Sequence, residues 1–149
     1  MKSFLLLLFT CSSLHNPNED FINPTGTYIL KGNVAKNKIV THSGEIRVKL
    51  LDRHKVAICF YINKGYPGYE SISFVDTLRY DDDYIVRYKP SPNADCLVMF
   101  SFNNKQAEIQ QVYSDPRSGC DFGRNILVST SFKKFSSDEP IIQDLSMHG

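Results

Sequence analysis

One loop of the sequence contains Asp121-Phe122-Gly123, the three letters that hold magnesium in protein kinases, directly after Cys120. A kinase also needs a glycine-rich phosphate loop, a strand lysine and a catalytic-loop aspartate. The chain has none of these motifs and is far shorter than a kinase domain. We therefore interpret Cys120 as the informative residue of the loop. Its disulfide would fasten the loop, and Phe122 would cover one end of the fold.

Three other patterns could carry chemistry. Asp81-Asp82-Asp83 could hold calcium, but adjacent aspartates in a turn between two strands point apart into water. The four histidines are His15, His42, His54 and His148, and they show no ligand spacing. No serine lies in a nucleophile-elbow pattern. We therefore expect no metal site, no cofactor and no enzymatic activity.

Asp76 is the polar residue whose position is most unusual. It falls on the apolar face of a strand predicted over residues 71–80, between Phe74 and Leu78. A buried carboxylate must be paired or hydrogen-bonded. Candidate partners are Arg87, the tyrosines Tyr80, Tyr84 and Tyr88, or backbone amides. Two alternatives stay open: Asp76 makes a polar contact at the bottom of a binding cavity, with Tyr80 as a further candidate ligand residue, or it belongs to a structural hydrogen-bond knot or a bulge that turns it outward.

The loop at residues 64–70 is a candidate binding loop. It presents Tyr66 and Tyr69 between glycines and a proline. Binding loops use this composition because tyrosine offers a large contact area at a low entropic cost. The alternative is a hairpin loop whose tyrosines pack on the rim of the fold.

The elements that must position these residues are strands. Residues 45–50 alternate charged and aliphatic side chains, which is typical of a sheet with one wet face and one buried face. Further strands are expected at 27–30, 38–41, 56–62, 71–80, 84–88, 95–102, 106–113 and 126–135, with no helix longer than two turns. The pattern predicts an all-β fold, an antiparallel meander of about eight strands that forms a small barrel or sandwich.

The chain length and charge indicate one ordinary domain. Its 149 residues include 17 basic and 16 acidic side chains, so no nucleic-acid footprint is present. We expect a monomer divided into a signal segment (1–11), a tether rich in Asn-Pro pairs (12–25), a β-barrel domain (26–135) and a C-terminal tail (136–149).

The N-terminal segment has the shape of a short signal peptide, with one lysine followed by an apolar run from Phe4 to Phe9. Residues 8–11 also resemble a bacterial lipobox, in which the cysteine carries lipid after cleavage. We expect export to the periplasm, outer membrane or cell surface with Cys11 as a lipid anchor. The alternative is an ordinary secreted protein.

The cysteines of an exported chain are read first as bonds or anchors. Around the turn at residues 103–104, Cys96 is expected opposite about Val112, beside the loop that carries Cys120. This register predicts a Cys96–Cys120 disulfide. Cys59 is expected as a buried free thiol in mid-strand, behaving as a small hydrophobe.

Several short motifs resemble those of small exported bacterial envelope proteins with β-barrel domains. They are Gly26-Thr27-Tyr28, Asp76-Thr77-Leu78-Arg79-Tyr80, the Cys96 to Phe102 strand, Cys120 to Gly123 and Phe132-Lys133-Lys134. The resemblance implies export and a barrel. Some small lipoproteins of comparable architecture inhibit lysozymes, but their specific loop motifs are absent, so no residue is assigned that role.

The leading hypothesis is a non-enzymatic exported envelope protein that binds another protein or a glycan through its loops. An inhibitor is one form that this binding role could take. The alternative is a small-molecule carrier of lipocalin or avidin type, since eight strands can just enclose one ligand. The interior decides between them: a cavity supports a carrier, and a filled core supports a scaffold with binding loops. The residues expected to fill that core are Phe60, Phe74, Phe100 and Ile109.

Overall fold

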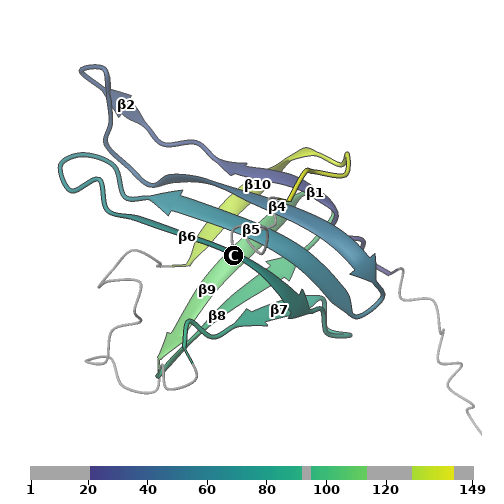
Figure 1. Cartoon of the computed structure of the whole chain (residues 1–149). Helices are drawn as coiled ribbons and strands as arrows, with labels where there is room; N and C mark the ends of the chain where they lie inside the picture. The colour runs from purple at the N-terminus through teal and green to yellow at the C-terminus, as the bar shows by residue number, and fades with distance from the viewer. Residues whose placement is uncertain (1–20, 92–94, 114–128, 143–149) are drawn as a thin grey trace, which may run out of the picture.

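The computed structural model describes residues 21–91, 95–113 and 129–142 of the chain (Figure 1). These residues form an all-β fold, as the sequence predicts, with eight antiparallel strands in a sheet nearly closed into a barrel. The strands of the sheet are β1 (Gly26–Leu30), β4 (Ser43–Asp52), β5 (Lys55–Asn63), β6 (Ser71–Arg79), β7 (Ile85–Tyr88), β8 (Cys96–Phe102), β9 (Gln106–Tyr113) and β10 (Thr130–Ser136). A separate hairpin is formed by β2 (Val34–Ala35) and β3 (Lys38–Ile39).

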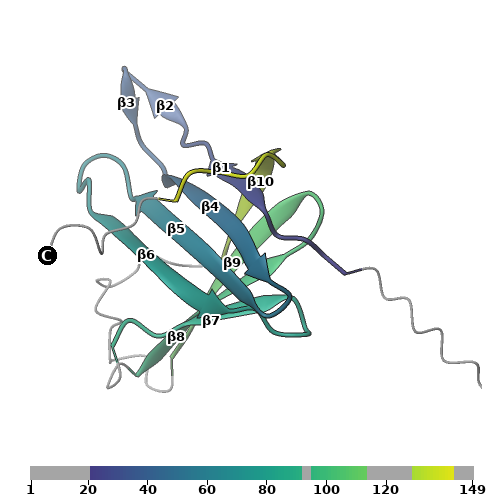
Figure 2. The same ribbon diagram turned by 45° about the vertical axis from the view of Figure 1, so that its right-hand side comes forward.

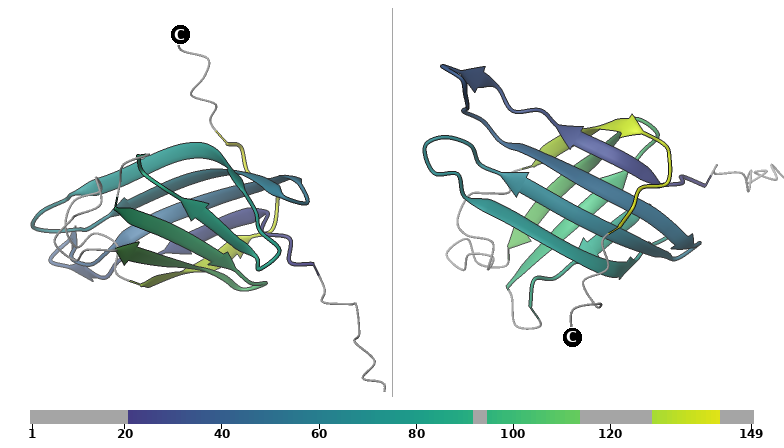
Figure 3. Two further views of the ribbon diagram at one scale, coloured as in Figure 1. Left: turned by 90° about the horizontal axis from the view of Figure 1, so that it is seen from below. Right: turned by 45° about the horizontal axis from the view of Figure 1, so that its top comes forward.

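The sheet follows the chain order almost throughout. Its order is β6-β5-β4-β1-β10-β9-β8-β7, so consecutive strands of the sheet pair with each other except β6 and β7, which lie at its two ends. In the middle of the order β1 pairs with both β4 and β10. Tyr28 lies opposite Lys134 in that closing pair. The views in Figure 3 show the strands curving around a common interior. The first and last strands therefore turn the meander into a ring.

The ring has one weak seam, between β6 and β7. In the described residues the two strands share the single bridge Tyr80↔Val86. β7 is only four residues long, and Pro90 follows it, so the ladder cannot continue. Side chains span the rest of the seam: the Phe74 and Tyr88 rings stack with centroids 3.9 Å apart.

Alternation of side chains explains the best-paired strands. Ile46 and Val48 on β4 and Ile58 and Phe60 on β5 are fully buried, while the residues between them face outward. The same register pairs Ile46 with Phe60 and Val48 with Ile58. Both inward rows therefore meet in the core, which confirms the expected faces of these two strands.

Aromatic rings fill the barrel interior. The Phe60 ring lies 5.4 Å from Phe100, 5.5 Å from Phe74 and 6.2 Å from Phe132, measured between centroids. Phe60, Phe100 and Phe132 are fully buried, as is Ile109, and Phe74 is half-buried at the seam. The interior is thus packed with side chains at its centre.

One end of the barrel is covered by the segment at residues 21–25. The Tyr28 hydroxyl donates a hydrogen bond to the Pro24 carbonyl, and the Tyr80 hydroxyl donates one to the Ile22 carbonyl, both at 2.8 Å. The Phe21 ring lies edge-on to Tyr80, 6.1 Å away. These residues, which the sequence assigns to the tether, therefore pack against the barrel. We call this the turn end, because the tight turns after β4, β6 and β8 lie there.

The opposite end, the loop end, receives all the longer connections between strands. These connections run from β1 to β4, from β5 to β6, from β7 to β8 and from β9 to β10. The β2–β3 hairpin projects from this end, away from the chain entry at Phe21 (Figure 2). The described residues include no helix long and apolar enough to span a membrane.

Candidate binding surface

The β2–β3 hairpin extends the chain beyond the barrel. Val34 pairs with Ile39 and Ala35 pairs with Lys38. The two turn residues, Lys36 and Asn37, have positive φ angles of 48° and 60°. Two positive φ angles are the signature of the type I′ turn, whose twist matches that of the paired strands. The hairpin is therefore a regular turn on a very short ladder.

The loop at residues 64–70 folds onto itself beside the hairpin. The Lys64 amide donates to the Glu70 carbonyl and the Tyr69 amide donates to the Gly65 carbonyl, both at 2.8 Å. Gly65 has a φ of +82°, a region that side-chain-bearing residues rarely adopt. Its amide donates to Oδ1 of Asn63 at 2.7 Å. These bonds hold the loop in one conformation.

Three contacts join the hairpin and the loop, which are distant in sequence. The Tyr66 amide donates to the Ile39 carbonyl at 2.7 Å. The Lys38 ammonium lies 4.2 Å from the centre of the Tyr66 ring, a cation–π contact. Gly65 packs so closely that an added Cβ would lie 2.7 Å from the Thr41 carbonyl oxygen. We call this braced unit, residues 31–42 and 63–70, the lobe.

The lobe exposes apolar and aromatic side chains. Tyr66 and Tyr69 are 46% and 51% exposed, and their rings lie edge-on with centroids 6.0 Å apart. The other exposed apolar residues of the lobe are Val34, Ile39 and Val40. Exposed apolar groups gathered in one place mark interaction sites more often than scattered ones do.

Charge separates the two ends of the barrel. The lobe contains four lysines and one glutamate, Glu70, which pairs with Lys64 at 3.4 Å. The described turn-end segments (51–55, 79–84, 103–105 and 136–142) carry six carboxylates against four basic side chains. The lobe is therefore more basic than the described turn-end segments, and it attracts acidic surfaces over distances comparable to the Debye length.

Asp76 is exposed, which argues against the first of the two alternatives, a buried contact at the bottom of a cavity. In the ladder it lies opposite the fully buried Ile58, so its position alternates inward as the sequence indicates. It lies, however, on β6 beside the seam, where the barrel opens. Its Oδ1 accepts a hydrogen bond from the Thr77 amide at 2.7 Å. Burial, and secondarily the charge of Asp76, raises the pKa of Tyr88.

Tyr80 has surroundings quite different from those of Asp76. It is fully buried, and its hydroxyl is engaged by the Ile22 carbonyl. Burial raises the pKa of Tyr80, with smaller contributions from Tyr28, Tyr84 and Asp83. The described contacts of Tyr80 are therefore those of a core residue that holds the N-terminal segment in place. Of the four predicted ligand residues, the structure brings together Tyr66 and Tyr69.

Two of the four cysteines lie within the described residues. Cys96 is buried at the start of β8 opposite Tyr113, one residue from the expected partner. Cys59 is a free thiol, but it is half-buried on the outer face opposite Arg47, so its expected burial in the core is wrong. Burial raises the pKa of Cys59, while Arg47 lowers it. Cys11 and Cys120 lie outside the described residues, as does the Asp121 to Gly123 motif.

The acidic turn Asp81-Asp82-Asp83 engages arginine. Arg87 donates to Asp83 at 2.7 Å and also bonds Asp81, and the hydrogen bond from Arg87 is the main reason that the pKa of Asp83 is lowered. Within the described ranges, no group of three or more His, Cys, Asp or Glu side chains is placed to hold a metal ion.

Sequence reasoning expected a strand over residues 38–41, which includes β3, but missed β2 and the hairpin that the two strands form. The signal available was Asn37 in a two-residue turn flanked by Val34 and by Ile39-Val40, apolar residues on both sides of a turn former. Each arm contributes only two ladder residues, too few for period-two alternation. A scan against protein-family models and searches among curated proteins and solved structures find no match to the chain.

Proposed function

We propose that the chain is a non-enzymatic, exported binding protein that engages another protein or a glycan through the lobe. The observation that carries the proposal is the bracing of two sequence-distant connections into one exposed surface. The Tyr66 amide to Ile39 carbonyl bond fixes that surface before any partner arrives. A preorganised surface loses less conformational entropy on binding than a loose loop does.

The tyrosines supply the energetic centre of this surface. Tyr66 and Tyr69 stand edge-on at the tip, about half exposed. Tyrosine is enriched among the few interface residues that dominate binding energy. The lysines of the lobe, including Lys38 beside the Tyr66 ring, favour an acidic partner and increase its association rate at low salt.

The packed interior supports a scaffold over the alternative of a small-molecule carrier. A carrier needs an enclosed cavity, of about 300–1,000 Å³ in typical sites. At the centre of this barrel, the Phe60 ring packs against the rings of Phe100 and Phe132, and all three side chains are fully buried. A ligand at the centre of the barrel would have to displace them.

Export, lipid attachment at Cys11 and the Cys96–Cys120 disulfide complete the proposal. The signal-like sequence of residues 1–11 supports the first two. Cys96 lies buried at the loop end where the connection from β9 to β10 begins, and it is not among the free cysteines of the described residues. Radiolabelled palmitate should label the wild type and not Cys11→Ala, whereas an unlabelled wild type would leave secretion alone.

Affinity capture from the native envelope tests the binding role. The bait is the wild-type chain, the double variant Tyr66→Ser with Tyr69→Ser, or the control Tyr61→Ser, a tyrosine of similar exposure (44%) on β5 outside the lobe. We expect the wild type and the control to retain the same protein or glycan, and the double variant to lose it. Equal capture by all three baits would contradict the proposed role of the lobe.

A further inference from the structure

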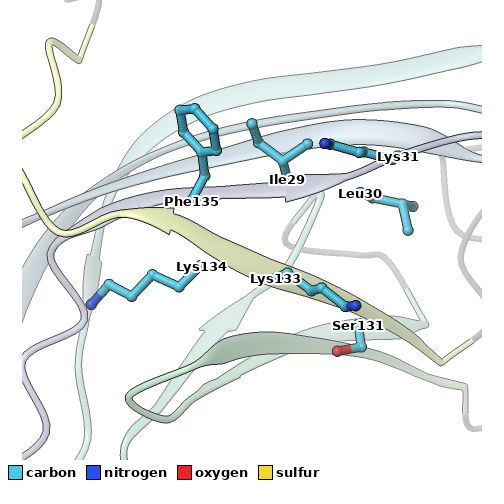
Figure 4. A pocket seen from close by; sticks show the side chains of 7 residues that line it. All are labelled: Ile29, Leu30, Lys31, Ser131, Lys133, Lys134 and Phe135. Atoms are coloured by element: carbon cyan, nitrogen blue, oxygen red, sulfur yellow. The ribbon is translucent and has the colours of Figure 1, made fainter.

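A hollow of about 400 Å³ lies on the outer wall of the barrel, between β1 and β10 (Figure 4). Its lining residues are Ile29, Leu30, Lys31, Ser131, Lys133, Lys134 and Phe135. The hollow is separate from the lobe tyrosines and from the packed interior. Its volume falls in the range of sites for small molecules, roughly 300–1,000 Å³, and is too small for a folded partner.

Strand geometry creates this hollow. The β1–β10 ladder ends at Ile29↔Lys133. Beyond that pair, Leu30 pairs with Gly44 on β4 and turns toward the core, while Thr130 pairs with Ile109 on β9. The two strands therefore part toward the loop end, and the space between them is floored by Leu30.

The hollow has an apolar side. Ile29 is half-buried, and Phe135 is 72% exposed, the second most exposed of the large apolar residues in the described part of the chain. Figure 4 shows both side chains standing on the same side of the strands. An exposed phenylalanine beside an isoleucine offers a surface on which a hydrocarbon chain loses water contact.

The hollow also has a cationic side. Lys31 follows β1 directly, and Lys133 lies opposite Ile29 at the point where the two strands part. Both lysines line the hollow, so their long side chains can approach one ligand group from the two strands. Lys134 takes another direction in Figure 4, and its ammonium lies 5.4 Å from the centre of the Tyr28 ring.

Neither cation is neutralised by a described neighbour. Among the described residues, no carboxylate lies within 4.0 Å of Lys31 or Lys133. The flanking acids on the adjacent strands have partners of their own. Glu45, opposite Ile29 on β4, accepts from Arg47 at 2.5 Å, and Glu108, opposite Ser131 on β9, accepts from Gln106 at 2.6 Å. Lys31 and Lys133 therefore have no described carboxylate as an ion-pair partner.

We propose that this hollow binds a free single-chain amphiphile with an anionic head group. The hydrocarbon chain lies against Ile29 and Phe135, and the head group lies between the ammonium groups of Lys31 and Lys133. The Ser131 hydroxyl is available at the same edge to donate a hydrogen bond to the head group. The combination of an apolar wall with two cations that pair with no carboxylate of the described residues selects this ligand class over neutral chains and over small polar anions.

Titration calorimetry with dodecanoate and dodecyl phosphate, kept below micelle-forming concentrations, tests the proposal. The neutral amphiphile dodecyl maltoside is the comparison ligand. The double variant Lys31→Gln with Lys133→Gln removes the cations, and Lys55→Gln with Lys105→Gln makes the same charge change with exposed lysines at the turn end. Phe135→Ser removes the apolar contact. All these side chains are exposed, so the fold should persist, as far-UV circular dichroism can check.

We expect saturable one-to-one binding of both anions to the wild type. The affinity should fall about tenfold or more in the Lys31/Lys133 variant, because charge-assisted contacts are lost, and it should be unchanged in the Lys55/Lys105 control. Phe135→Ser should weaken both anions as well. The absence of saturable binding, equal losses in both lysine variants, or equal affinity for dodecyl maltoside would overturn the proposal. Association only with vesicles that contain phosphatidylglycerol would overturn it too, since it would point to a membrane surface. The Tyr66/Tyr69 variant should bind the amphiphile normally.

Discussion

Phe60 lies at the centre of the barrel, and its truncation tests whether the interior is a packed core. The side chain is fully buried and touches the rings of Phe74, Phe100 and Phe132. Phe60→Ala removes the ring and leaves a cavity that three neighbouring rings cannot fill without leaving their rotamers. Such truncations lower the free energy of unfolding by about 3–5 kcal/mol. The whole stability of a domain this size is about 5–15 kcal/mol, so the variant should be close to unfolding at 37 °C.

Urea denaturation followed by far-UV circular dichroism gives the measurement, with the disulfide state held constant. The slope of the unfolding free energy against urea should stay at the wild-type value, because the surface exposed on unfolding is nearly unchanged. The matched control is Tyr61→Ala, the next residue on β5, which faces outward and is 44% exposed. It should shift stability by about 0.5 kcal/mol.

A loss of less than about 1.5 kcal/mol for Phe60→Ala would refute the reasoning, since core truncations of this kind rarely cost so little. It would mean that the interior collapses easily or is already open. In that case the carrier alternative would regain support, and the lobe would lose its status as the favoured site.

Three further predictions concern the loop end and the core. Burial raises the pKa of Tyr28, so the unfolded chain loses that proton first. The free energy of unfolding, measured by urea denaturation, should be steady below pH about 10, the ordinary tyrosine value, and should fall above it. A free energy of unfolding that stays constant or rises above that pH would contradict the buried hydroxyl. Gly65→Ala should lower the free energy of unfolding by about 1–2 kcal/mol, because Gly65 has a positive φ and close carbonyl neighbours. The control Gly68→Ala should be nearly neutral, since its added Cβ would meet its nearest neighbour at 4.0 Å. Equal urea midpoints for the two variants would argue against the tight contact between Gly65 and residues 39–41. Non-reducing peptide mapping should find Cys96 joined to Cys120, and reduction should cost about 3 kcal/mol, whereas two free thiols would exclude the bond.

Strand alternation made most of the barrel predictable. Residues 45–50 and 56–62 carry regular inward rows, and the rows meet in the core as β4 and β5. The turns between them are short and polar, so antiparallel pairing follows from chain connectivity. The sequence predicted either a barrel or a sandwich, and the pairing of β1 with β10 makes the fold a nearly closed barrel. Nothing local in either strand distinguishes the two architectures.

Asp76 shows where alternation stops being informative, whereas the outward position of Cys59 follows from the alternation itself. Asp76 occupies an inward position by parity, but the neighbouring strand β7 ends early, so an inward position at the seam reaches water. Cys59 differs by parity alone: it lies between Ile58 and Phe60, which face the core, and therefore faces outward. Its own side chain carries too little apolar area to change that register.

The lobe was half predicted. The composition of residues 64–70 indicated a binding loop, and Tyr66 and Tyr69 are exposed there. The brace to Ile39 could not be predicted, because it joins residues far apart in sequence through a backbone hydrogen bond. Backbone atoms are the same in every residue, so such a contact leaves no trace in side-chain pattern.

Closure of the barrel by its first and last strands bears on how fast the domain folds. The ring forms only when Tyr28 on β1 meets Lys134 on β10, and pairing of such distant residues is slow. Until then both strands present open edges that can join those of other chains. Deleting β10 would therefore not simply shorten the barrel. It would leave β1 as a permanent edge, and the concentration-dependent aggregation of refolding chains would become the dominant event.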